Sequence, residues 1–127
     1  METNKKGAFE RKYPQQVFLV SCGNGCKRIT VSEIAYIEAM RDNCILHMKD
    51  GNCHFLSCPM CDVEEDLNED DFKRIHRSFI VNISYIAEYN FGSVVLENGK
   101  NVKIGKDYRV SLKASLWFWG QRKRDNK

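Results

Sequence analysis

The sequence has no long hydrophobic run and little proline. None of its 127 residues lies in a stretch approaching the roughly 20 apolar residues that a membrane-spanning helix requires. Residues 1–12 are polar and of mixed charge, without the apolar segment and small-residue cleavage pattern of a secretory signal. Two prolines exclude a proline-rich linker. We therefore expect a cytoplasmic protein with a single folded domain, since a chain of this length has no room for two.

A convincing set of catalytic or metal-binding residues is also missing. The three histidines, His47, His54 and His76, lack the spacing of helical zinc motifs. The glycines on either side of Asn24 lack the third glycine of a dinucleotide-binding loop. We therefore expect no enzymatic activity, no metal and no cofactor.

Six cysteines are present, and in the cytosol they are expected to be reduced thiols. Cys58 and Cys61 have the two-residue gap of zinc knuckles and dithiol redox sites, and Cys22 and Cys26 flank a glycine-rich turn. One motif of this kind is weak, so buried or incidental thiols are the simpler interpretation. A thiol-based redox or zinc-binding interaction module built on these four cysteines remains the alternative function.

Charge is unevenly distributed along the chain. Residues 62–71 carry seven acidic side chains and no basic one, so removing their −7 from the total of +3 leaves +10 elsewhere. A basic body with one segregated acidic element favours binding to a polyanion, because Lys and Arg that neutralise phosphates dominate affinity for nucleic acids. The alternative is a solvated acidic helix with scattered basic side chains.

Alternating apolar residues predict strands over much of the chain. The predicted strands are 16–21, 27–31, 36–39, 44–49, 53–57, 72–75, 83–89, 93–97 and 101–104. The pairs Asp50-Gly51 and Asn98-Gly99 predict type I′ hairpin turns, and Asn24-Gly25 supplies residues suited to positive φ. Short helices are predicted at 61–67 and from Lys106 to Gly120, with two of the aromatic residues 117–119 in the core. The fold class is therefore mostly β with two short helices.

Residues 72–82 interleave basic and apolar side chains. The apolar set, which is Phe72, Ile75, Phe79 and Ile80, can anchor the segment in the core, while Lys73, Arg74, His76, Arg77 and Ser78 project outward. An arginine mounted in this way contacts phosphates or reads a guanine edge through two parallel hydrogen bonds. The structural alternative is that His76 and Arg77 cap loops or pair with the acidic segment.

Several segments, in order and with fitting spacings, resemble the LytTR family of DNA-binding domains between about residues 16 and 116. They are IAYIEA at 34–39, Leu46-His47, Asp50-Gly51, FKRIHRSFIVN at 72–82, VVLENG at 94–99 and Ile104-Gly105. The resemblance implies an elongated set of small antiparallel β-sheets in which loops, rather than a recognition helix, enter the major groove of double-stranded DNA. It also implies a bacterial transcription regulator that binds paired short sites, with a second copy of the chain on the DNA.

The resemblance places three DNA-reading loops at residues 41–44, 76–77 and 105–107. The implied contacts are Arg41 and either Asn43 or Cys44 in the first loop, His76 and the base-reading Arg77 in the second, and Lys106 in the third. Cys44 departs from the family pattern because a thiol is a poor hydrogen-bond donor. Lys73 and Lys103 are expected to contact phosphates, and Asn82 is assigned to structure.

We expect three regions: a leader at 1–15, the DNA-binding domain at 16–120 and a basic tail at 121–127. The family usually places this domain behind a receiver or a membrane sensor, so the chain is expected to be either a stand-alone regulator or a fragment. A third interpretation is an RNA or single-strand binder, which would need exposed aromatic residues on a sheet face. Phe18, Phe55 and Tyr89 could serve in that way but fit core positions equally well.

Overall fold

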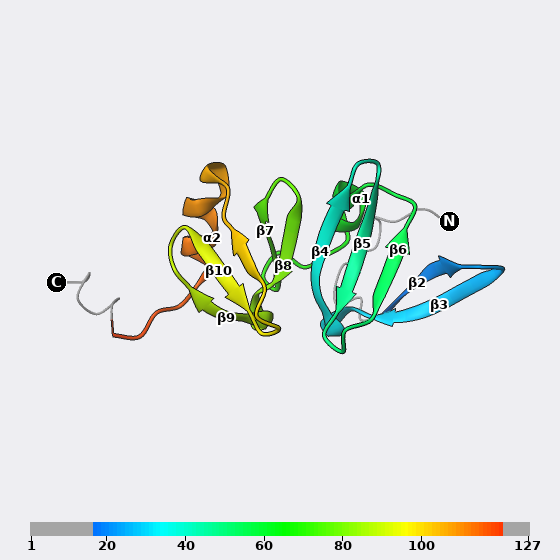
Figure 1. Ribbon diagram of the computed structural model, residues 1–127, viewed down its shortest axis with the longest axis horizontal. Helices are drawn as coiled ribbons and strands as arrows, with labels where there is room; N and C mark the ends of the chain where they lie inside the picture. The colour runs from blue at the N-terminus through cyan, green and yellow to red at the C-terminus, as the bar shows by residue number, and fades with distance from the viewer. Residues whose placement is uncertain (1–16, 121–127) are drawn as a thin grey trace.

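The protein is elongated and consists of three small antiparallel sheets arranged in a row (Figure 1). The computed structural model describes residues 17–120, and the predicted leader at 1–15 and tail at 121–127 lie outside the described residues. The mostly β fold class with two short helices is confirmed. Among the described residues, no helix has the length and hydropathy of a membrane span.

The central sheet has five strands and carries most of the predicted motifs. Its order is β6 (Cys53–Leu56), β5 (Asn43–Met48), β4 (Ile34–Met40), β8 (Phe79–Asn82) and β7 (Phe72–His76). All neighbours are antiparallel, so the β4–β5 and β7–β8 hairpins lie side by side with their turns at the same end. A short 3₁₀ helix, η1 (Val31–Glu33), leads into β4.

Helix α1 (Met60–Glu65) covers one face of this sheet. Side chains that alternate along the strands form a buried cluster on that face with Met60 of α1; they include Ile37, Cys44, Leu46 and Ile80. The intervening residues, such as Glu38 and His47, belong to the opposite face because successive side chains in a strand alternate. The acidic residues of the α1 segment therefore lie on the covered side of the sheet.

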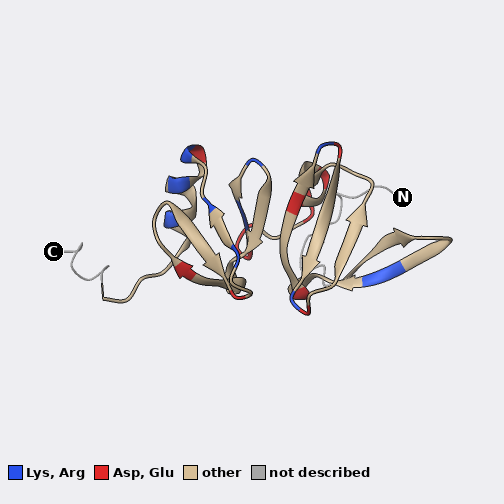
Figure 2. Cartoon of the chain, viewed as in Figure 1, with Lys and Arg blue, Asp and Glu red and all other residues tan. Residues whose placement is uncertain are grey.

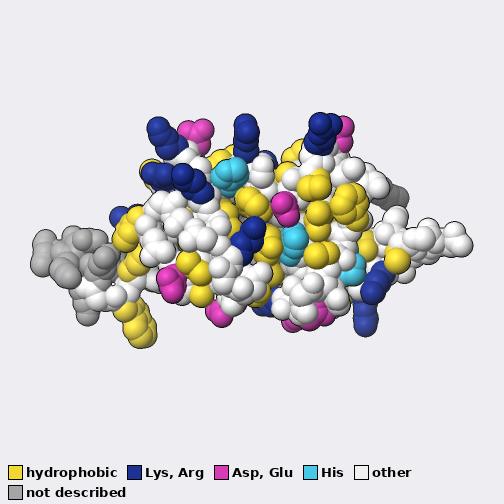
Figure 3. All heavy atoms as spheres, viewed as in Figure 1, with side chains coloured by type: hydrophobic (Ala, Val, Ile, Leu, Met, Phe, Trp, Pro, Cys, Tyr) yellow, Lys and Arg dark blue, Asp and Glu magenta, His cyan; other side chains and the backbone are white. Residues whose placement is uncertain are grey.

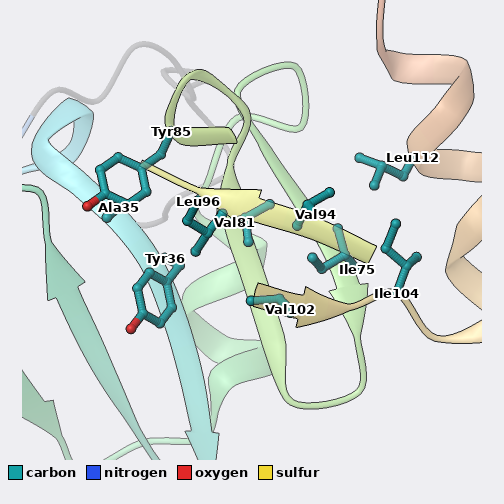
Figure 4. Close-up of a cluster of buried hydrophobic side chains, with 10 residues drawn as sticks. All are labelled: Ala35, Tyr36, Ile75, Val81, Tyr85, Val94, Leu96, Val102, Ile104 and Leu112. Atoms are coloured by element: carbon teal, nitrogen blue, oxygen red, sulfur yellow. The ribbon is translucent and has the colours of Figure 1, made fainter. Parts of the chain in front are cut away.

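The second sheet consists of β9 (Ile86–Tyr89), β10 (Ser93–Leu96) and β11 (Asn101–Lys103), preceded by η2 (Ile83–Tyr85). It is followed by η3 (Lys106–Tyr108) and α2 (Arg109–Ser115). Figure 4 shows the core that joins this sheet to the central one, made of Ala35, Tyr36, Ile75, Val81, Tyr85, Val94, Leu96, Val102, Ile104 and Leu112. This shared core holds the loops at the ends of the two sheets in a constant arrangement.

The third sheet is the hairpin of β2 (Val17–Cys22) and β3 (Gly25–Thr30), which projects from the end of the molecule. Its turn is Gly23-Asn24, and the positive φ of 60° falls on Gly23 rather than on the predicted Asn24-Gly25 pair. The predicted type I′ turns are also wrong in geometry, because only Gly51 and Gly99 have positive φ there. In both hairpins four residues separate the strands, so a longer loop replaces the two-residue turn.

Three elements differ from the sequence prediction. Strand β8 is absent from the predicted strands. It is covered on both faces, so Ile80 and Val81 are both buried and no alternating pattern marks it. The predicted strand at 83–89 begins only at Ile86, after the 3₁₀ turn η2. Helix α2 ends at Ser115, since Leu116 is extended, and Trp117 and Trp119 are 82% and 93% exposed. The prediction that two of the three aromatic residues are buried is therefore wrong; Phe118 alone is half-buried, against Tyr89.

Asn82 has the structural role that its sequence position suggested. Its amide nitrogen donates to the backbone carbonyl of Ile34 at 2.9 Å, and its oxygen accepts from the backbone N–H and the hydroxyl of Ser84 at 3.0 and 2.9 Å. The side chain is 5% exposed, so these bonds satisfy a buried polar group. Asn82 thereby fixes the junction between β8, η2 and the start of β4.

Candidate nucleic-acid interface

The three loops predicted to read DNA lie next to one another along one edge of the molecule. The backbone N–H of Ala39, near the end of β4, donates to the carbonyl of Ser78 in the β7–β8 turn at 2.9 Å. On the other side of that turn, the N–H of Gly105 donates to the carbonyl of Ile75 at 2.9 Å. Figure 2 shows Lys and Arg positions at these three places along the upper edge, and Figure 3 shows Lys and Arg side chains projecting from that edge. The fold thus brings together segments separated by more than sixty residues.

Arg41 and Asp42 form the two-residue turn between β4 and β5, where Met40 pairs with Asn43. Arg41 has a φ of 61°, in the left-handed region that costs a non-glycine residue roughly 1–2 kcal/mol. Its side chain is exposed. A strained non-glycine residue at a turn tip is a feature that clusters at functional sites.

Cys44 cannot contact DNA, so the expectation that it faces the groove is wrong. Its side chain is fully buried on the α1 side of the sheet. Burial raises the pKa of the Cys44 thiol to about 12, so it stays neutral at physiological pH. Neighbouring residues in a strand point to opposite faces, so Asn43 lies on the open face of the sheet. Its side chain is half-buried, and Asn43 rather than Cys44 can therefore approach a ligand.

His76 ends β7 and Arg77 forms the tip of the β7–β8 turn. The backbone N–H of Ser78 donates to Nδ1 of His76 at 3.0 Å, so Nδ1 is an acceptor and the neutral ring carries its proton on Nε2. This leaves Nε2–H as the donor that His76 offers to a ligand. Arg77 is exposed.

Arg74 holds this turn, a role that the sequence did not reveal. Its Nη2 donates to the carbonyl of Arg77 at 2.7 Å and its Nε to the carbonyl of His76 at 3.3 Å. Its Nη1 donates to Oε1 of Glu64 on α1 at 2.9 Å. The sequence grouped Arg74 with the outward-projecting residues; the only available signal for its role was an arginine near the turn and an acidic helix close by in the chain.

The third loop, residues 105–107, is held in a similar way. Nε of Arg109, the first residue of α2, donates to the carbonyl of Ile104 at 3.2 Å. A Cβ on Gly105 would lie 3.1 Å from the ring of Tyr108, so the loop is tight against η3. Lys106 is exposed at this loop, and Lys103, at the end of β11, is exposed just before it. Arg109 is a second positioning residue that the sequence did not identify.

The structure does not bring Lys73 to this edge. Lys73 is half-buried three residues before the end of β7, roughly 10 Å along the strand. It lines a surface hollow together with Glu64, Glu65 and Glu69. These carboxylates oppose the approach of a phosphate, so the expected phosphate contact of Lys73 is not retained.

The cysteines proposed for an alternative function are not arranged as a site. All six are free thiols. Among residues 17–120, no group of three or more His, Cys, Asp or Glu side chains is placed to hold a metal ion. The geometry therefore gives the zinc-binding alternative no support.

Basic loops that lie along one edge of a mostly β domain are the arrangement expected of a DNA-binding domain that contacts DNA through loops. A family model of the LytTr DNA-binding domain matches residues 24–117, and the chain belongs to this family. The solved LytTr DNA-binding domain of a Bacillus cereus response regulator has a TM-score of 0.69 and 25% sequence identity to this chain. That match covers 82% of this chain and 99% of the other. The predicted family and fold are thus confirmed.

Curated relatives match over a shorter region. The sensory transduction protein LytT of Bacillus subtilis (strain 168) is 36% identical over 59 residues, 42% of this chain and 24% of LytT. The transcriptional regulatory protein LytR of Staphylococcus aureus (strain N315) is 36% identical over 63 residues, 46% of this chain and 26% of LytR. The matched region therefore spans about a quarter of the length of these relatives.

Proposed function

We propose that this chain is the DNA-contacting part of a bacterial transcription regulator, and that the edge formed by its three loops enters the major groove. The observation that carries the proposal is the placement of Arg41, the His76-Arg77 pair and Lys106 side by side on that edge. Such a regulator acts in the cytoplasm by binding and recruitment, without bond chemistry.

Each loop residue has a role suited to its chemistry. Arg77 reads a guanine through two parallel hydrogen bonds, and the Nε2–H of His76 donates to a neighbouring base acceptor or phosphate. Asn43 offers an amide at the open face of the first loop, a group that pairs with adenine. Arg41, Lys103 and Lys106 neutralise phosphates and fix the register.

The dimensions of the edge favour a short site. The β4–β5 and β7–β8 turns are two strand spacings apart, about 10 Å, and the third loop adds about 5 Å. A row of about 15 Å exceeds the roughly 12 Å width of the major groove, so it lies along the groove and covers about four to five base pairs. So short a site carries little information, which is why we propose paired sites occupied by two copies of the chain.

The test is selection from a random duplex library with the purified chain at near-physiological salt. We expect an enriched pair of short motifs, bound about a hundredfold or more tightly than scrambled duplex in anisotropy titrations. A duplex with one motif scrambled is the matched control for pairing. Binding without enrichment would contradict sequence-specific reading, and enrichment of a single unpaired motif would contradict the two-copy arrangement.

A further inference from the structure

Three side chains form a hydrogen-bonded row on the open face of the central sheet, the face opposite α1. Oε1 of Glu38 on β4 lies 2.9 Å from Nε2 of His47 on β5. Nδ1 of the same ring lies 3.5 Å from Sγ of Cys53 on β6. The three residues come from adjacent strands, and Cys53 pairs with His47 in the sheet register. The row is distinct from the edge proposed to contact DNA.

The hydrogen bonds define the direction of proton transfer in this row. An ionised carboxylate only accepts, so Nε2 of His47 carries the proton that Glu38 binds. In the neutral ring Nδ1 is then the unprotonated nitrogen, and its lone pair faces the thiol of Cys53. A base next to a thiol, itself oriented by a carboxylate, is the arrangement that activates a cysteine nucleophile.

The ring of His47 is held in this orientation and the thiol is accessible. The ring stacks on Tyr36 with the two planes 9° apart and the centroids separated by 4.2 Å. Cys53 is exposed, whereas the side chain of His47 is 21% exposed. A half-buried base beside an exposed thiol allows a small reagent to reach the sulfur without displacing the ring.

The other exposed cysteines lack this arrangement within the described residues. Cys22 and Cys26 lie at the ends of the β2–β3 strands next to the turn, away from any of the three histidines in the strand register. Sγ of Cys61 donates to a carboxylate oxygen of Asp62 at 3.9 Å, so the partner of this thiol is an acidic side chain and not an imidazole. Cys22 and Cys26 can therefore serve as internal references against which the reaction rate of Cys53 is compared.

We propose that Cys53 is a covalent modification site that takes up small disulfides, with His47 as the base and Glu38 as the positioning residue. The Cys53 proton passes to Nδ1 of His47, and the thiolate attacks one sulfur of the disulfide. A bond forms between Cys53 and that sulfur while the original S–S bond breaks. The leaving thiolate takes the proton from His47 and departs as a thiol, so the exchange needs no further oxidant.

The site lies away from the proposed DNA-contacting edge. His47 and Cys53 flank the loop at 49–52, whereas the turn at Arg41 and Asp42 is at the other end of β5. Four residues along the strand place His47 roughly 14 Å from Asn43. The proposal and the DNA-binding proposal therefore depend on different residues and are tested separately.

The test is reaction of the full chain with oxidised glutathione, followed by peptide mass spectrometry that gives a rate constant for each cysteine. We expect Cys53 to form the mixed disulfide at least about tenfold faster than Cys22 and Cys26 in the same molecules, since general-base assistance contributes about a hundredfold or more in well-formed sites. Equal rates for the three thiols would overturn the proposal.

Two variants test the roles of the row. In His47→Gln we expect the Cys53 rate to fall to that of Cys22, and in Glu38→Gln to fall about threefold, an order-of-magnitude value for loss of the orienting charge. Unfolding of a variant would raise the reaction rates of buried and exposed thiols alike. A decrease in rate at Cys53 alone therefore indicates loss of the general base and not loss of stability. If His47→Gln does not fold, Glu38→Gln decides the matter. An unchanged Cys53 rate in either folded variant would overturn the assigned role of the row.

Discussion

The guanidinium of Arg74 donates to the backbone carbonyl of Arg77 at 2.7 Å, so one arginine of the central motif holds the turn that presents the other. The same guanidinium bonds the carbonyl of His76 and the carboxylate of Glu64. Three donors in a fixed plane restrain the turn before any ligand arrives. Preorganisation of this kind reduces the entropy that ordering would otherwise cost on binding.

Replacing Arg74 by Lys should weaken DNA binding although the charge is kept. A lysine ammonium cannot reproduce the planar fork that joins two carbonyls and a carboxylate, so the turn loses its restraint. We expect about a tenfold loss of affinity for the selected duplex and a decrease of about 1 kcal/mol in the free energy of unfolding. Anisotropy and urea denaturation measure the two effects.

The matched control is Glu64→Gln, which removes the ion pair and leaves the carbonyl bonds of Arg74 in place. Since Glu64 is 40% exposed, the change should cost less than about 1 kcal/mol and leave affinity within about twofold. An affinity of Arg74→Lys equal to that of the unchanged protein would contradict the positioning role.

Arg77→Ala should relax sequence preference, whereas Lys106→Ala should weaken binding to all duplexes. Loss of a bidentate base contact costs about 1–3 kcal/mol on the specific site alone. Loss of one phosphate contact makes the plot of log affinity against log salt concentration less steep, by about 1 in the magnitude of its slope. Titrations on selected and scrambled duplexes at several salt concentrations separate the two. Equal losses on both duplexes for Arg77→Ala would remove its base-reading role.

Arg41→Gly should be more stable than Arg41→Ala, although both variants lose the same charge. The φ of 61° at this position suits glycine and strains any residue with a Cβ. We expect a difference of about 1 kcal/mol in the free energy of unfolding and similar losses of DNA affinity. Urea denaturation of the pair gives the answer, and identical stabilities would show that the turn is not strained by a side chain.

Cys44→Ala should leave DNA affinity unchanged while altering the pH dependence of stability. The unfolded thiol ionises above about pH 9, but burial raises the pKa in the folded state to about 12. Between these values the unfolded state binds fewer protons, so the contribution of Cys44 to stability is present below pH 9 and is lost as pH rises. From pH 8 to pH 10 the wild type should lose about 1.4 kcal/mol more than Cys44→Ala.

The control for this prediction is Asn43→Ala, which should weaken DNA binding because Asn43 lies on the open face of the first loop. Tyr36 and Tyr89, whose pKa values are also raised by burial, are common to the wild type and Cys44→Ala and cancel in the comparison. Weaker DNA binding by Cys44→Ala, without a loss of stability, would contradict the assignment of Cys44 to the core and indicate that it contacts DNA.

Sequence reasoning located most strands but failed where the local pattern does not determine the structure. Ile80 and Val81 are both buried because β8 is covered on both faces, and such a strand has no alternation to detect. Gly51 and Gly99 marked the hairpin positions correctly, but the loops contain four residues, and only the glycine of each Asx-Gly pair has a positive φ. Trp119 lies within the predicted helix from Lys106 to Gly120, yet the chain leaves the helix at Leu116.

The site was predictable as a set of segments but not as a set of contacts. The loops at 41–44, 76–77 and 105–107 followed from the resemblance to the LytTR family, because each lies within or next to a segment that carries the resemblance. The sequence could not assign Cys44 to the core, since the register that separates Asn43 from Cys44 is set by pairing with β4. Nor could it show that Arg74 points back to Arg77, because that contact depends on the turn and on α1 together.

The most direct measurement of the central claim is an NMR titration of the ¹⁵N-labelled chain with the selected duplex. We expect the largest amide shifts at residues 41–43, 76–78 and 105–107, all on the edge shown in Figure 2. The open face around His47 and Cys53 should shift little. Shifts concentrated on that face or on the β2–β3 hairpin, with the three loops unchanged, would contradict the proposed interface.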